Sequence, residues 1–163
     1  MGLFSKLFVK KETGTDKDGD LDGPCESYYE NGQLESKRNY KDEKLDGLLE
    51  LYYENGQLDY KSNFKDGDPD GPCEYYYENG QLDYKSNFKD GDPVGPCEYY
   101  YENGQLKAKG NFKDGDLDGP CVMYHQNGQL KENGTYNMGE RCGEWIEDGK
   151  TVTYPPCPDC DDE

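Results

Sequence analysis

The sequence predicts an all-β protein built as a row of β-hairpins, and two observations lead to this fold class. The first is a repeat of 24 residues, which places an Asn-Gly dipeptide at Asn31, Asn55, Asn79, Asn103 and Asn127. A fixed period of this size is the signature of a repeat architecture. The second is that Tyr and Leu flank the Asn-Gly of the first four repeats, with His125 in place of Tyr in the fifth. This pattern predicts a hairpin with a type I′ turn. Each repeat therefore contributes two strands and one turn.

The third repeat shows how the elements are expected to follow one another. Lys65 to Gly71 is read as a loop, Pro72 to Glu78 as a strand, Asn79-Gly80 as the turn and Gln81 to Phe88 as the second strand. Folding about the turn then sets the register of the two strands. The predicted partners are Glu78 and Gln81, Tyr77 and Leu82, Tyr75 and Tyr84, Glu74 and Lys85, and Cys73 and Ser86.

This register sorts the side chains of a repeat onto two faces, because side chains alternate across a strand. The apolar face is expected to hold Cys73, Tyr75, Tyr77, Leu82, Tyr84, Ser86 and Phe88. The polar face is expected to hold Glu74, Tyr76, Glu78, Gln81, Asp83 and Lys85. The same register predicts cross-strand ion pairs between Glu26 and Lys37, Glu50 and Lys61, Glu74 and Lys85, and Glu98 and Lys109. Each such pair contributes a few tenths of a kcal/mol.

The period divides the chain into three parts. Residues 1–16 precede it, residues 17–150 hold five repeats and a degenerate terminal hairpin, and residues 151–163 form an acidic tail with Pro and Cys that we expect to be disordered. In the first part, Leu3, Phe4, Leu7 and Phe8 with neighbouring Lys residues suit a short amphipathic helix. This segment would either cap the first hairpin or lie on a membrane surface.

Composition limits the kind of partner that the chain can bind. The net charge of -18 disfavours nucleic acid and favours a cationic partner, although acids can also merely solvate loops and keep strand edges apart. The hydrophobic fraction is only 31%, so the 16 Tyr residues are expected to supply much of the buried surface.

The cysteines indicate a reducing compartment. Cys25, Cys73, Cys97 and Cys121 occupy one column of the repeat. Two strand spacings, about 9.5 Å, separate successive members of a column, which is too far for a disulfide. These four residues are therefore expected to be free thiols. Because the sequence also shows no secretory signal and no membrane-spanning stretch, we expect a cytoplasmic protein.

The repeat resembles the MORN repeat, and specifically its bacterial variant. The resemblance rests on the doublet Tyr76-Tyr77, the motif Asn79-Gly80-x-Leu82, the aromatic Phe88 and the dipeptide Asp90-Gly91, and it covers residues 17–150. It implies a single-layer, twisted antiparallel sheet of stacked hairpins whose aromatic groove serves protein or lipid contacts. The family is commonly associated with antitoxins. This chain departs from the usual repeat because Cys stands where Trp is frequent, with Trp145 as the exception.

Two groups of residues suggest metal sites weakly. Three loops match the first half of an EF-hand but lack its bidentate Glu, so polar turns explain them better than calcium sites. The calcium candidates are Asp18, Asp20, Asp22, Asp66, Asp68, Asp70, Asp114, Asp116 and Asp118. Cys157 and Cys160 have zinc or redox spacing but lack a second pair of ligands. We expect no cofactor and, since no catalytic motif is present, no enzymatic activity.

The remaining candidate is a row of Tyr residues on the polar face, beside a row of Glu. The expected site residues are Tyr28, Tyr52, Tyr76, Tyr100, Tyr124, Glu26, Glu50, Glu74 and Glu98. Aromatic rings among acids suit Arg and Lys side chains, although the rings can also simply stack and stiffen the sheet. We therefore expect a protein-binding module, in the manner of an antitoxin or immunity protein, that covers a basic partner. The alternative is a scaffold that attaches to membrane through residues 1–11, and the oligomeric state is left open.

Overall fold

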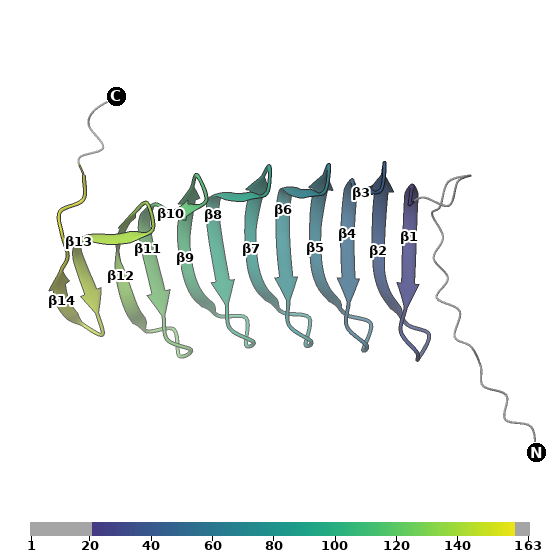
Figure 1. Cartoon of the computed structure of the whole chain (residues 1–163). Helices are drawn as coiled ribbons and strands as arrows, with labels where there is room; N and C mark the ends of the chain where they lie inside the picture. Colours follow the sequence, from purple (N-terminus) through teal and green to yellow (C-terminus); the bar gives the residue numbers. More distant parts are fainter. Residues whose placement is uncertain (1–20, 159–163) are drawn as a thin grey trace, which may run out of the picture.

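The structure, a computed structural model, describes residues 21–158 and contains one open, fully antiparallel sheet in which the strands follow one another in sequence order (Figure 1). It confirms the predicted all-β row of hairpins; the segment expected to form an N-terminal helix lies outside the described residues. The strands that open the repeats are β1 (Gly23–Tyr28), β4 (Gly47–Tyr52), β6 (Asp68–Tyr76), β8 (Asp92–Tyr100), β11 (Gly119–Tyr124) and β13 (Glu140–Glu147). The strands that close them are β2 (Leu34–Lys41), β5 (Leu58–Lys65), β7 (Leu82–Lys89), β9 (Leu106–Lys113), β12 (Leu130–Asn137) and β14 (Lys150–Thr153). Two short strands, β3 (Lys44–Leu45) and β10 (Asp116–Leu117), pair only with β2 and β9.

The Asn-Gly turns form one edge of the ribbon, and they are not of the predicted type I′. The N–H of Gly80 donates to the carbonyl of Tyr77 at 2.8 Å, and only the glycine of the pair has a positive φ, +81°. The side chain of Asn79 instead accepts the N–H of Gln81 at 2.9 Å, an arrangement that Asn forms readily. The turn is thus a type I turn followed by a left-handed Gly, and the bulge places Leu82 opposite Tyr76 rather than Tyr77.

The type I′ turns lie at the opposite edge, at the Asp-Gly dipeptides. Asp90 and Gly91 both have positive φ, 49° and 91°, and the flanking Lys89 pairs directly with Asp92. The segment from Lys65 to Gly71, expected as a loop, is therefore a two-residue turn followed by the start of β6. Asp in the left-handed region tolerates this turn because its short polar side chain bonds locally.

Away from the Asn-Gly turns, the predicted register is confirmed. The predicted pair of Glu78 and Gln81 is not formed, because the N–H of Tyr77 donates to the carbonyl of Gln81 at 2.8 Å. Cys73 pairs with Ser86, Glu74 with Lys85 and Tyr75 with Tyr84, and equivalent pairs recur in the other repeats. The Cys and Glu columns therefore point to opposite sides. We call the side that carries the Cys column (Cys25, Cys73, Cys97 and Cys121) the Cys face.

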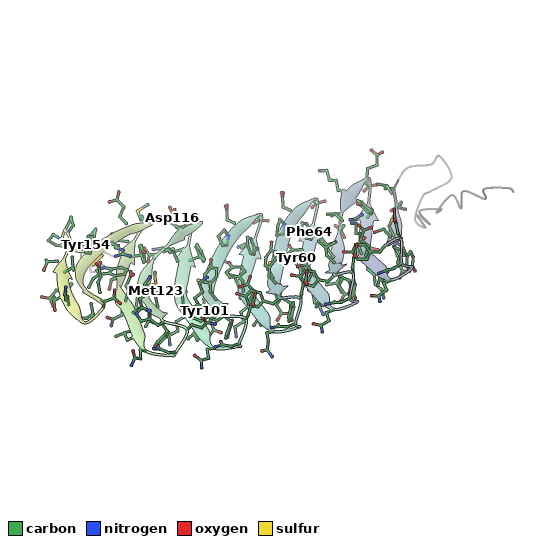
Figure 2. The ribbon with its side chains drawn as sticks, turned by 90° about the horizontal axis from the view of Figure 1, so that it is seen from below. Tyr60, Phe64, Tyr101, Asp116, Met123 and Tyr154 are labelled. Carbon is green, nitrogen blue, oxygen red and sulfur yellow. A yellow bond between two sulfur atoms is a disulfide. The ribbon has the colours of Figure 1, made fainter. Side chains whose placement is uncertain are left out.

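The core lies on the Cys face (Figure 2 labels Tyr60 and Phe64 among its residues). All four cysteines of the column are buried and are free thiols, as predicted. Beside them, four tyrosines from adjacent strands form a row: Tyr60, Tyr75, Tyr84 and Tyr99. Successive ring centroids in this row lie 4.6, 6.0 and 4.5 Å apart. Aromatic packing thus replaces an aliphatic interior.

Order continues past residue 150, into the segment expected to be a disordered tail. Strand β14 pairs with β13 across an Asp148-Gly149 turn, and Cys157 forms a disulfide with Cys142. Trp145 takes the place of the column cysteines, as predicted, and is fully buried. Within residues 21–158, no helix has the length and apolar character needed to cross a membrane.

Candidate functional site

The surface opposite the Cys face carries a repeated pair of Tyr and Glu, two residues apart on each of the first four opening strands. We call it the Tyr–Glu face; it holds Glu26, Tyr28, Glu50, Tyr52, Glu74, Tyr76, Glu98 and Tyr100. The hydroxyl of Tyr52 donates to the Glu50 carboxylate at 3.0 Å, and that of Tyr76 donates to Glu74 at 2.8 Å. Tyr28 with Glu26 and Tyr100 with Glu98 form the same bond. The structure therefore brings together eight of the nine predicted site residues as four equivalent pairs.

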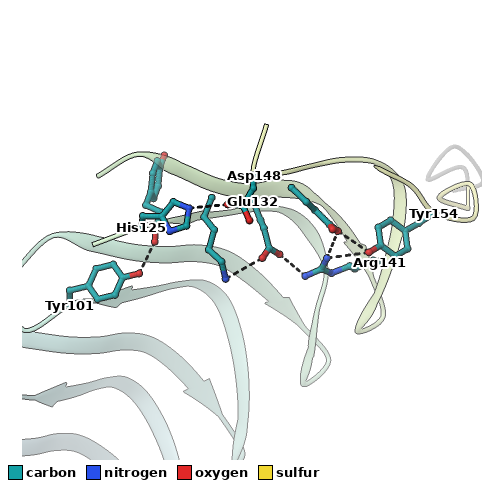
Figure 3. A network of polar contacts seen from close by, with 9 residues as sticks. Tyr101, His125, Glu132, Arg141, Asp148 and Tyr154 are labelled. Atoms are coloured by element: carbon teal, nitrogen blue, oxygen red, sulfur yellow. Dashed lines mark hydrogen bonds and ion pairs between the residues drawn. The ribbon is translucent and has the colours of Figure 1, made fainter. Parts of the chain in front are cut away.

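Tyr124, the ninth predicted residue, has no such partner because Val122 stands where the preceding repeats have Glu. Its main-chain carbonyl accepts the hydroxyl of Tyr101 at 2.8 Å, as the carbonyls of Tyr52, Tyr76 and Tyr100 accept the hydroxyl of a preceding Tyr (Figure 3). The imidazole of the neighbouring His125 forms a hydrogen bond with the carboxylate of Asp148, 2.9 Å away. The Tyr–Glu pattern thus ends at the fourth repeat.

Lysines separate the Glu residues of the Tyr–Glu face, so the charges alternate along the sheet. In the register, Lys85 lies between Glu74 and Glu98, and Lys37 and Lys61 are flanked by Glu in the same way. The ammonium of Lys61 lies 3.7 Å from Glu50, and that of Lys37 lies 3.9 Å from Glu26. This face is consequently not uniformly acidic.

The third ion pair differs from the prediction. Lys85 binds Glu98 of the next repeat at 2.7 Å rather than Glu74, because a lysine in the middle of the row has a carboxylate on either side. This hydrogen bond lowers the pKa of Glu98 and raises the pKa of Lys85. Lys109 is in register with Glu98, but within residues 21–158 it makes no ion pair.

The Tyr rings of this face are partly covered and their hydroxyls stay protonated. Burial and the bond to Glu74 raise the pKa of Tyr76 to about 12, and burial raises the pKa of Tyr52 and Tyr100 in the same direction. The ammonium of Lys85 lies over the Tyr100 ring, 5.9 Å from its centroid. The chain therefore already forms the kind of cation–π contact that was predicted for a basic partner.

The unbalanced negative charge lies along the edges of the ribbon. Each Asn-Gly turn of the first four repeats carries one exposed Glu: Glu30, Glu54, Glu78 and Glu102. The turns that carry these four residues follow one another along the lower edge of the ribbon in Figure 1. They were not among the predicted site residues, although their fixed place beside each Asn-Gly is visible in the sequence.

The aspartates proposed as calcium ligands occupy turns and strands. Asp66 sits in a type I′ turn, Asp68 opens β6 and Asp70 lies further along the same strand. Asp114, Asp116 and Asp118 line a cavity of about 420 Å³ together with Lys113. Within the described part of the chain, no three acidic, His or Cys side chains converge as metal ligands. Asp22 is exposed, and Asp18 and Asp20 lie outside the described residues.

The sulfur of Cys157 is bonded to Cys142 and is therefore not available as a zinc ligand in this structure. Cys160 lies outside the described residues. No spacing rule predicts this pairing from the sequence, because the two residues meet only when the segment after β14 folds back on β13. Such crosslinks persist in oxidising compartments, whereas the four column thiols gave the expectation of a reducing one.

Sequence reasoning also missed a polar cluster at the end of the Cys face (Figure 3). The guanidinium of Arg141 binds Glu132 at 2.7 Å and Glu147 at 2.6 Å, and it stacks 4.2 Å from the ring centroid of Trp145. The hydroxyl of Tyr154 donates to Glu147 at 2.8 Å. This cluster covers Trp145, the last aromatic residue within a strand of the sheet.

The family model described as "MORN repeat variant" matches five consecutive segments, residues 21–42, 45–66, 69–90, 93–114 and 117–138. No curated protein matches the chain. Among solved structures, the accessory secretory protein 1, 2 and 3 complex of Streptococcus pneumoniae is similar with a TM-score of 0.37 and 11% identity, over 80% of this chain and 23% of that chain. A GtfA/B complex is similar with a TM-score of 0.27 and 16% identity, over 73% of this chain and 21% of that chain. The chain thus spans less than a quarter of either structure, and likenesses this low support no argument about function.

Proposed function

Because the chain belongs to the MORN repeat variant family, we propose that it is a non-enzymatic module that binds another protein through its Tyr–Glu face. The observation that supports this most is the recurrence of the same Tyr–Glu pair in four consecutive repeats. Successive pairs are two strands apart, about 9.5 Å. A continuous sheet holds them, so the array is ordered before a partner arrives.

The chemistry of this array suits basic side chains on the partner. Each Glu keeps carboxylate oxygens that can accept further bonds, and each Tyr ring offers a face for a cation. Arg is the best match, because its planar fork can bind a carboxylate and stack on an aromatic ring at once. The exposed Glu row of the Asn-Gly edge would attract such a partner from a distance and raise the association rate.

The proposed mechanism is occlusion. A rigid ribbon covers a basic site on the partner and blocks the access of other molecules to it, as an antitoxin or immunity protein does. The alternation of Lys and Glu along the Tyr–Glu face adds specificity. A partner whose charges do not match this spacing would place like charges opposite each other.

The proposal is tested by capture of partners from the native cell, with the full chain and with a variant in which Tyr52, Tyr76 and Tyr100 are replaced by Ala. The expected result is that the variant loses the captured protein. The matched control replaces Tyr75 and Tyr99, the two most exposed rings of the Cys-face row, and should retain it. A partner held equally by the chain and by the first variant would exclude the Tyr–Glu face as its site.

A further inference from the structure

A groove opens on the same side of the ribbon as the Tyr–Glu face, where the charged row of that face ends. In the register, Lys109 pairs with Val122, Val122 with Asn133, and Asn133 with Ile146. The groove over these residues has a volume of about 750 Å³. This volume lies in the range of sites that bind ligands or side chains of partners.

The groove lies at the same position in the repeat pattern as a smaller cavity two repeats earlier. The smaller cavity is lined by Glu74, Lys85 and Glu98 and has a volume of about 310 Å³. Addition of 48 to these numbers leads to Val122, Asn133 and Ile146, all of which line the larger groove. The flanking residues also correspond: Pro120 and Thr135 of the larger groove stand 48 residues after Pro72 and Asn87 of the smaller cavity. At each of the three positions Val122, Asn133 and Ile146, an apolar or neutral side chain thus replaces the ionised side chain of the earlier repeats.

A polar atom in the floor of the groove lacks a partner. The side-chain oxygen of Asn133 is buried and accepts no hydrogen bond within the described residues. An unsatisfied buried acceptor is unfavourable, so a donor that reached it from the groove would bind favourably. At one end of the groove, the ammonium of Lys109 is free of ion pairs within residues 21–158 and can donate to an acceptor.

The charges of the groove balance each other. Lys109 contributes the positive charge of its lining and Glu144 the negative one, while Pro96, Val122 and Ile146 supply apolar walls. A strongly basic segment would therefore meet Lys109, and an acidic one would meet Glu144. An uncharged peptide segment fits better, because each peptide group offers both an N–H donor and a carbonyl acceptor.

We infer that this groove binds a short, extended, uncharged segment of the protein partner. An apolar side chain of the segment would lie on Val122 and Ile146, a main-chain N–H would donate to the Asn133 side chain, and a carbonyl would accept from Lys109. This inference rests on the proposed protein-binding function and adds a second, apolar point of contact to the basic one. The Tyr–Glu face would then supply charge recognition, and the groove would supply sequence recognition.

Two variants test the groove through exchange of the corresponding residues. Substitutions V122E, N133K and I146E restore the charged row of the internal repeats and close the groove. Substitutions E74V, K85N and E98I copy the groove into the third and fourth repeats. Both changes use residues that the same sheet already accommodates at the same positions, and the thermal unfolding of each variant checks that it folds.

The probe is a random peptide library selected on the full wild-type chain, after which a selected peptide is titrated calorimetrically into each protein. The expected peptides carry an apolar residue and few charges. They should bind the V122E/N133K/I146E chain at least about tenfold more weakly, a difference of about 1.4 kcal/mol, and should bind two sites on the E74V/K85N/E98I chain. In two-dimensional NMR spectra, the peptide should shift the amide signals of Gly110 and Gly134, which line the groove.

Two results would overturn the inference. One is a set of peptides that bind the V122E/N133K/I146E chain as tightly as the wild type, and the other is a library from which no groove-dependent peptide emerges. If such peptides instead lose binding when Tyr52, Tyr76 and Tyr100 become Ala, then the groove is excluded while the Tyr–Glu face keeps its role. The failure of the groove and the failure of the proposed function are thus separable.

Discussion

The hydroxyl of Tyr77 donates to the main-chain carbonyl of Tyr100, 2.7 Å away and 23 residues further along the chain. The same bond recurs from Tyr29 to Tyr52, from Tyr53 to Tyr76 and from Tyr101 to Tyr124, at 2.5 to 2.8 Å. The side chain of Asn79 adds a bond of 2.8 Å to the carbonyl of Glu102, in the next turn. Each Asn-Gly turn is therefore tied to the one that follows, so the second Tyr of each doublet joins neighbouring repeats.

The Tyr77→Phe substitution should reduce the free energy of unfolding by about 1 kcal/mol, since it removes one hydrogen bond and leaves a partly buried carbonyl short of a donor. Chemical denaturation measures the effect. The Tyr76→Phe substitution is the matched control, because it removes a hydroxyl that bonds only a side chain, Glu74. Equal losses from the two substitutions would show that the inter-repeat bond has no special role.

The close contact between Gly134 and Trp145 predicts that the two positions depend on each other. A Cβ added at Gly134 would lie 2.1 Å from the Trp145 ring, so Gly134→Ala should destabilise the chain by about 1–3 kcal/mol or more. In a chain that also carries W145C, the cysteine of the internal repeats, the same substitution should cost much less. A double-mutant cycle by thermal unfolding measures this coupling. Additive effects would contradict the contact.

The disulfide between Cys142 and Cys157 should stabilise the final strand pair. The two residues are 15 apart in sequence, and closure of a loop of this size contributes about 3 kcal/mol. A reductant should therefore lower the unfolding temperature of the wild-type chain, and C157A should lower it without reductant. The unfolding temperature of C157A should not respond to reductant, because Cys142 then lacks its partner and the other four described cysteines are free thiols. A reductant-sensitive C157A chain would point to a different crosslink.

The buried tyrosines should make the folded chain less stable at high pH. Burial raises the pKa of Tyr76 and of Tyr99 from 10.0 to about 12 in the folded chain. Because the folded pKa exceeds the unfolded one, this stabilisation is complete below pH 10 and is lost as the pH rises toward 12. Absorbance of the tyrosinate ion and circular dichroism, recorded together, should change in that window. Ionisation of all tyrosines near pH 10 with an unchanged sheet would contradict it.

Strand order, the register away from the Asn-Gly turns and the two faces could be predicted from the sequence because they follow from local rules. The spacing of the Asn-Gly dipeptides and the alternation of Cys73, Glu74 and Tyr75 are enough to specify them. The turn types could not be assigned correctly, since Asn-Gly and Asp-Gly suit the same type I′ geometry. Asn79 departs from it because its side chain bonds both Gln81 and the next turn, which only the folded stack brings within reach.

The sequence was enough to predict which residues form the candidate site, but not how their charges are arranged. The sequence places Glu74 opposite Lys85, yet only the sheet places Glu98 on the other side of the same lysine. The groove shows the same limit: Val122 and Asn133 are visible as departures from the repeat, but the cavity and the unpartnered oxygen arise from packing between strands. The local sequence pattern predicts which residues share a face of the sheet, whereas contacts between strands determine the ion pairs and cavities on that face.

Tyr75 and Tyr76 are adjacent in sequence but lie on opposite faces of the ribbon, with the ring of Tyr75 packed 4.6 Å from that of Tyr60 and the hydroxyl of Tyr76 bonded to Glu74. A photo-crosslinking amino acid placed at one or the other position in the full chain therefore tests most directly which face binds the partner. The proposed function predicts that position 76 crosslinks to the protein captured from the native cell and that position 75 does not. Crosslinking from position 75 alone would show that the Cys face, and not the Tyr–Glu face, is the binding surface.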